Sequence, residues 1–159
     1  MASKISKEAF KEQAREKAHA YHCQFYGCSQ VVLATFQELL GMEDELTFKA
    51  SSCFVGGIAK AGKTCGALLG GVMVLGMKYG REGLDRGLLC VLEGTEQAGS
   101  LVRSFEQEFG ATDCREITQV DFSDLKAAIE FFLGPEVEKC HQLVARTAEM
   151  VAEIINEEE

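Results

Sequence analysis

Apolar residues recur at spacings of three and four along most of the chain, which is the periodicity of amphipathic α-helices. The stretch from Gly62 to Gly76 departs from this pattern. It has no charged residue after Lys63, and its apolar positions do not keep to one stripe. A helix here would be covered on nearly every side, so we predict a buried central helix.

Glycines in this central stretch predict close packing. Gly66 and Gly70 lie four residues apart, and each glycine lowers helix propensity by roughly 1 kcal/mol relative to alanine. We therefore expect both to face a neighbouring helix at short backbone distance. Thr64 is the predicted N-cap, which places Cys65 in the first turn, where free N–H groups and the positive end of the helix dipole favour a thiolate. Cys65 is the first candidate for a reactive residue.

The remaining helices follow from the same spacings and from their stop signals. An apolar stripe from Phe10 to Tyr21 predicts a surface helix, and Gly41 is a stop signal for the helix after it. Cys28 begins that second helix and is therefore a second reactive candidate. The predicted helices cover about residues 7–22, 28–40, 45–55, the central stretch, a segment that Gly110 closes, 124–133, and a last helix that restarts at Pro135.

Two segments lack helical periodicity. Residues 81–83 are predicted to begin a connector, and residues 111–124 are predicted to form a loop because their one β-tolerant run has no partner. The sequence therefore predicts one all-α domain of about five to seven helices around a buried glycine-rich helix. It comprises an N-terminal helix over about 7–22, a core over about 27–156 and an acidic tail at 157–159.

Composition narrows the function classes. The chain has 159 residues and a net charge of −9, and it has no dense basic cluster, which argues against binding to nucleic acid. The first residues lack an apolar signal core, and the run around Leu68 to Met77 is too short to span a bilayer. We expect a cytoplasmic protein without membrane insertion.

Seven cysteines are the main chemical signal. An odd count in a chain that can build its own core favours free thiols, a metal or a redox pair over a secreted disulfide scaffold, although free cysteines are also common as small buried hydrophobes. No CxxC, CxxCH, HExxH or P-loop motif is present. His22 and His141 adjoin cysteines in sequence, but neighbours on a helix point about 100° apart, so we expect both to be solvated.

The cysteines and glycines carry a family resemblance. Gly27-Cys28-Ser29-Gln30, Cys65-Gly66-Ala67-Leu68-Leu69-Gly70, Cys114 and Cys140 together resemble the putative redox-active protein family named for the pattern C-GCAxxG-C-C. The resemblance covers about residues 27–148, and Cys23, Cys53 and Cys90 fall outside its pattern. It extends to the cysteine region of a split-Soret type multihaem cytochrome, for which an iron–sulfur cluster has been proposed.

The resemblance implies that the four matching cysteines form one redox or metal site. Cys28 and Cys65 would be the catalytic thiols, and with Cys114 and Cys140 they would hold an iron–sulfur cluster or another thiolate-bound metal, or else form reversible disulfides. All four can reach a common point, because two begin helices, Cys140 lies on an inward seam and Cys114 follows a helix end.

Three hypotheses stay open at this stage. The first is a redox or metal module that exchanges electrons with an unidentified partner protein. The second is a thiol enzyme with one activated cysteine, although no motif supplies its base. The third is a helical binding or assembly domain with structural cysteines, for which we leave a homodimer open.

Overall fold

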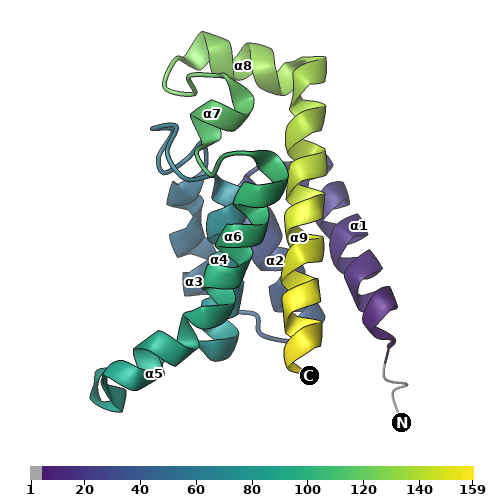
Figure 1. The fold of residues 1–159 in the computed structure, drawn as a ribbon. Coiled ribbons are helices and arrows are strands. Elements are labelled where there is room, and N and C mark those ends of the chain that lie inside the picture. Colours follow the sequence, from purple (N-terminus) through teal and green to yellow (C-terminus); the bar gives the residue numbers. More distant parts are fainter. Residues whose placement is uncertain (1–4) are drawn as a thin grey trace.

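The computed structural model describes residues 5–159, which form helices and turns without a β-strand. Figure 1 shows one helical body, and the predicted all-α class is confirmed. The helices are α1 (Lys7–Phe25), α2 (Cys28–Leu40), α3 (Glu45–Ala50), α4 (Gly66–Tyr79), α5 (Gly87–Gly94), α6 (Glu96–Phe109), α7 (Cys114–Thr118), α8 (Leu125–Leu133) and α9 (Glu138–Glu158), with short 3₁₀ helices η1 (Ser51–Phe54), η2 (Leu84–Arg86) and η3 (Pro135–Val137).

The local sequence explains several helix ends. The Ser6 hydroxyl accepts a hydrogen bond from the Ala9 N–H at the start of α1, and the Asp124 carboxylate accepts two from the first turn of α8. Gly41 ends α2 in the left-handed conformation, with a φ of 64°. Helix α9 runs through Glu158, so the acidic end of the chain is mostly helical.

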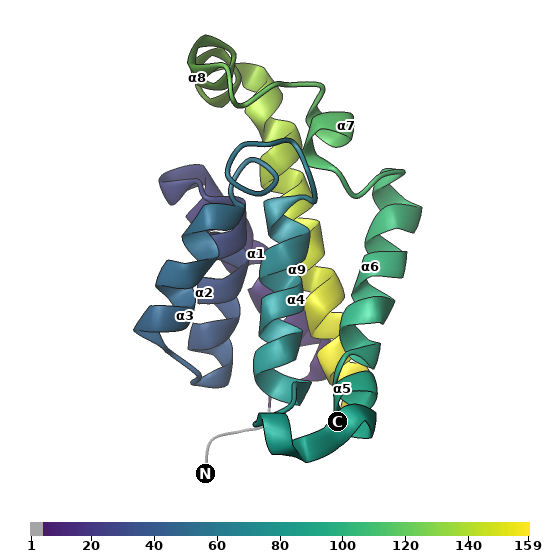
Figure 2. The ribbon, with the colours of Figure 1, turned by 90° about the vertical axis from the view of Figure 1, so that its left-hand side faces the viewer.

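Helix α4 lies at the centre of the bundle and packs against α2, α6 and α9, and α9 runs along α1 (Figures 1 and 2). Leu68, Val74 and Leu75 of α4 are almost fully buried. Burying such side chains stabilises the fold by about 1.5–3 kcal/mol each. The central buried helix is confirmed as the element around which the others are arranged.

Gly66 and Gly70 face α2 as expected. A Cβ atom added at Gly70 would lie 2.5 Å from the Ser29 carbonyl oxygen. One added at Gly66 would lie 3.0 Å from the Phe54 carbonyl oxygen of η1 and 3.4 Å from the Cys28 Cβ of α2. Gly76 of the same helix has open space around it. The first two glycines therefore let α2 and α4 approach closely.

Three local predictions were wrong. Residues 87–94 form α5 where a connector was expected, and residues 114–118 form α7 where a loop was expected. One helix was expected over residues 45–55, but residues 51–54 continue α3 only as a 3₁₀ helix. Short apolar runs do not by themselves reveal whether tertiary contacts will stabilise a helix.

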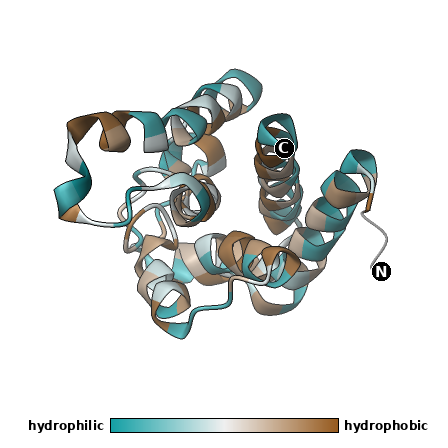
Figure 3. Cartoon of the chain, turned by 90° about the horizontal axis from the view of Figure 1, so that it is seen from below, coloured by the Kyte–Doolittle hydropathy of each residue, from teal (hydrophilic) through white to brown (hydrophobic). Residues whose placement is uncertain are grey.

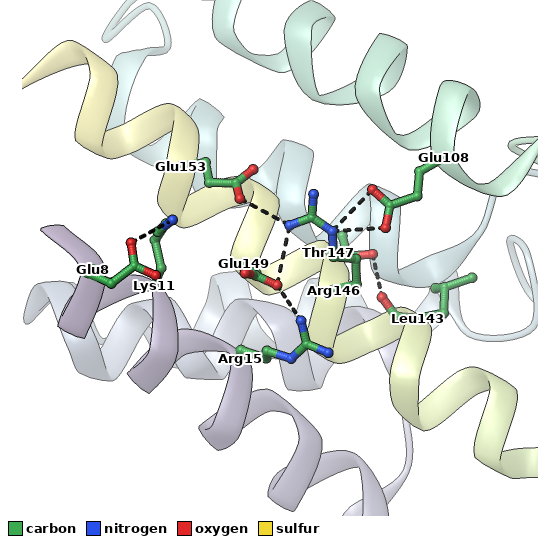
Figure 4. A network of polar contacts seen from close by, with 9 residues as sticks. All are labelled: Glu8, Lys11, Arg15, Glu108, Leu143, Arg146, Thr147, Glu149 and Glu153. Carbon is green, nitrogen blue, oxygen red and sulfur yellow. Dashed lines mark hydrogen bonds and ion pairs between the residues drawn. The ribbon is translucent and has the colours of Figure 1, made fainter.

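An ion-pair network on the outer face holds α1, α6 and α9 together (Figure 4). Arg146 of α9 contacts Glu108 of α6 at 2.9 Å and also contacts Glu149 and Glu153 of its own helix, and Arg15 of α1 contacts Glu149 at 2.6 Å.

Among residues 5–159, no helix is long and apolar enough to cross a membrane.

Candidate functional site

The structure brings four cysteines to one cavity at the end of the bundle that lies under α7 and α8 (Figure 1). Each lies near the start of a helix: Cys28 is the first residue of α2, Cys65 precedes α4, Cys114 is the first residue of α7 and Cys140 lies in the first turn of α9. We call these four the inner cysteines. That they form one site is a prediction.

Backbone pairing fixes Cys65 beside Cys114. The Cys65 N–H donates to the Thr112 carbonyl at 2.8 Å, and the Cys114 N–H donates to the Lys63 carbonyl at 2.7 Å. Thr64 and Asp113 form an isolated antiparallel bridge between these bonds. Cys65, and not Thr64, is therefore the N-cap of α4, because this distant segment holds residues 63–65 in an extended conformation.

Glycine is required where the preceding loop passes the site. Gly57 has a φ of 72°, in the left-handed region that other residues rarely adopt. A Cβ atom there would lie 2.7 Å from the Cys114 Cβ and 2.3 Å from the Lys63 carbonyl oxygen. The loop can therefore approach Cys114 only because this side chain is missing.

The cavity walls are mostly apolar. The space open to the centre of a water molecule is about 20 Å³, which is room for about one water molecule. Cys65, Cys114 and Cys140 are buried, and Cys28 is half-buried. Besides the four cysteines, the lining residues are Gly27, Val55, Gly56, Gly66, Ile117, Thr118, Phe122, Phe132 and Leu143.

Burial keeps the inner thiols protonated. Desolvation, with added repulsion from Cys65, raises the pKa of both Cys114 and Cys140 to about 12, and burial raises the pKa of Cys28 well above its usual range. Burial also raises the pKa of Cys65, although the Ala67 and Leu68 N–H groups oppose it. The expectation that a helix N-terminus would favour the Cys65 thiolate was wrong, because desolvation outweighs the helix end.

Two histidines lie next to the inner cysteines, and the sequence did not reveal that both are buried. His22 is fully buried, its Nε2 lies 3.4 Å from the Cys28 Sγ, and its Nδ1 lies 2.7 Å from the Nδ1 of the buried His141. A neutral His22 that donates from Nδ1 to His141 leaves Nε2 free to accept the Cys28 proton. The expectation that both histidines are solvated was wrong, and the four-residue spacing from Ala14 and Ala18 to His22 was the available signal.

The other three cysteines lie outside this cavity. Cys23 and Cys53 are exposed, and Cys90 is half-buried on α5. We call them the outer cysteines. The structure gives all seven cysteines as free thiols, so it shows no disulfide.

The inner cysteines suit a soft metal by chemistry but not by arrangement. Four thiols are the donor set that zinc and iron–sulfur clusters prefer. Within the described residues, however, no three or more His, Cys, Asp or Glu side chains are grouped so that they could hold a metal ion. A metal centre would need the sulfur atoms to move closer together.

The comparisons with known proteins agree with the cysteine pattern. A family model described as "Putative redox-active protein (C_GCAxxG_C_C)" matches residues 26–154. This range contains the whole cavity lining. No curated protein and no solved structure matches the chain.

Proposed function

Because the chain belongs to the C_GCAxxG_C_C family of putative redox-active proteins, we propose that it carries out reversible dithiol–disulfide exchange through Cys28 and Cys65. The observation that carries the proposal is that four thiols from four separate segments line one cavity. Four free cysteines without a shared role would more commonly be scattered through the core as small hydrophobes. Cys28 and Cys65 come first because their helices meet at Gly66.

Cys28 is the proposed attacking thiol. It is the half-buried member of the four and has a proton acceptor, the His22 Nε2, at 3.4 Å. Its sulfur attacks one sulfur of a disulfide in a partner protein as its proton passes through the His22 Nε2 to the other partner sulfur, which leaves as a thiol.

Cys65 is the proposed resolving thiol. The Cys65 sulfur attacks the Cys28 sulfur of the mixed disulfide, and its proton passes to the second partner sulfur, which leaves as a thiol. The partner disulfide thereby gains two electrons and two protons, and Cys28 and Cys65 lose them and form an S–S bond. The same steps in reverse would oxidise a partner dithiol. We place this exchange in the cytoplasm, with a redox protein as the partner.

The second candidate is a thiolate-bound metal or iron–sulfur cluster on all four inner cysteines. The all-sulfur donor set favours it, and metal binding would have to release the protons that burial keeps on Cys114 and Cys140. Metal and sulfide analysis of anaerobically purified protein tests it. A stoichiometric metal that is lost in Cys114→Ser and kept in Cys53→Ser would support the metal centre.

Thiol counting in redox buffers tests the exchange function. The protein is equilibrated with glutathione mixtures of increasing oxidation, alkylated and weighed by mass spectrometry. We expect two thiols to be lost together, in the parent and in Cys53→Ser but not in Cys28→Ser or Cys65→Ser. If no pair is lost, or if the pair persists in both site variants, the structural interpretation of an assembly domain replaces this proposal.

A further inference from the structure

A row of exposed leucines lies at the opposite end of the molecule from the cysteine cavity. Leu88 and Leu92 lie four residues apart on α5 with Leu89 beside Leu88, and Leu84 lies on the preceding η2, which joins α5 at Gly87. We call these residues the leucine face. They are 88%, 70%, 56% and 73% exposed, respectively. Such exposure is unusual, because leucine is among the residues most often buried.

Within residues 5–159, no other element covers this face. Helix α5 packs against η2 and α6 and projects from the bundle (Figures 1 and 2). Figure 3 shows its hydrophobic segment standing apart from the other helices. Four leucines exposed to this extent offer on the order of 500 Å² of apolar surface, a patch size that often marks an interaction site.

We propose that the leucine face binds the leucine face of a second copy of this chain, forming a symmetric dimer. A two-fold axis would pack the leucine face of one copy against that of the other, with the two segments running in opposite directions. Arg81, Glu82, Asp85 and Arg86 lie at one end of the segment, where Arg86 contacts Glu82 at 3.9 Å, and Glu93 lies at the other end. The two-fold axis would therefore bring Glu93 of one copy towards the arginines of the other.

Charge favours a second copy over other occupants. The chain as a whole carries −9, whereas residues 81–93 carry two arginines and three acidic residues, so repulsion between copies is weak at this surface. An anionic membrane would require a basic cluster, and the two arginines are outnumbered here.

Helix α8 provides a comparison for this proposal. Leu125, Ile129 and Leu133 also lie at spacings of four and are 73%, 49% and 81% exposed. Near it, however, Arg115 pairs with Asp121, Lys126 with Glu130 and Lys139 with Glu136, so its cations already have carboxylate partners within the chain. The α8 surface is therefore the matched control.

Sedimentation equilibrium of the full chain tests the proposal. We expect the parent to sediment at twice the chain mass of 17.4 kDa. Leu88→Glu with Leu92→Glu should weaken association at least 100-fold, and Leu88→Ala with Leu92→Ala should weaken it less. Leu125→Glu with Leu133→Glu should leave the dimer intact, and circular dichroism should show unchanged helicity in all variants.

Three results would overturn the proposal: a monomeric parent at every concentration, a dimer that survives both α5 double variants, or a dimer that dissociates only in the α8 variant. A monomeric parent that binds anionic vesicles through α5 would assign the face to a membrane. The measurement is made with a reductant, so that an intermolecular disulfide through Cys23, Cys53 or Cys90 of α5 does not supply the doubled mass.

Discussion

The inner and outer cysteines carry the same thiol in opposite surroundings. Cys114 and Cys140 are buried against phenylalanines and share a cavity with Cys28 and Cys65, whereas Cys53 is exposed and lies outside it. Packing, and not residue type, therefore sets the reactivity of these thiols. Burial raises the pKa of the inner thiols and limits the access of reagents from solvent.

Replacing Gly70 by Leu should disturb the inner cysteines the most, because it separates α2 from α4. The new side chain would start 2.5 Å from the Ser29 carbonyl oxygen, so α2 and with it Cys28 must move away from α4. We expect the free energy of unfolding to fall by about 3 kcal/mol or more, measured by urea denaturation. Gly76→Ala is the matched control, since its Cβ meets open space, and it should stabilise by up to about 1 kcal/mol. Equal stability of parent and Gly70→Leu would contradict the close approach.

Alkylation rates should distinguish the inner cysteines from the outer ones. A thiol with a pKa of about 12, as at Cys114 and Cys140, is ionised to roughly one part in 10⁴ at pH 8. We expect iodoacetamide to modify both at least 100-fold more slowly than the exposed Cys53 under native conditions, followed by peptide mass spectrometry. In denaturant the three rates should converge. Native labelling of Cys114 as fast as that of Cys53 would show that burial does not protect it.

Acid should weaken the inner region through its histidine. Burial, and then repulsion from His141 and His19, lowers the pKa of His22 from 6.5 to about 4. The unfolded chain binds this proton at higher pH than the folded one, so the stability that His22 contributes is complete above pH 6.5 and is lost as pH falls toward 4. We expect a loss of roughly 2 kcal/mol between pH 6.5 and pH 5, from urea denaturation at each pH.

Two variants separate His22 from the other groups. His22→Leu should flatten this pH dependence, and His19→Gln, on the exposed side of the same helix, should keep most of it. The window above pH 5 leaves out the salt-bridged carboxylates, whose lowered pKa values act at more acid pH. A parent stability that is flat from pH 6.5 to pH 5 would contradict the buried neutral histidine.

The sequence was enough to predict features that depend on local spacing. Helix α2 begins at Cys28 and ends before Gly41 because a glycine and an apolar stripe define it within one segment. The close approach at Gly70 was likewise predictable, since a glycine in an apolar helix needs a packing reason.

Long-range contacts decided the features that the sequence could not predict. Cys65 caps α4 because residues 112–114 pair with residues 63–65, and spacing along the chain carries no trace of that pairing. Histidine burial depended on two helices meeting at His22 and His141. The convergence of the inner cysteines was suggested by the family pattern, and only the folded chain shows that four separate segments line one cavity.

The most direct test of the central claim is a disulfide map of the mildly oxidised protein. The native protein is treated with oxidised glutathione, blocked with iodoacetamide and digested, and linked peptides are identified by tandem mass spectrometry. We expect one dominant link between the peptides of Cys28 and Cys65, with the same link in Cys53→Ser. Oxidation that yields only links through outer cysteines, or none among the inner four, would contradict it.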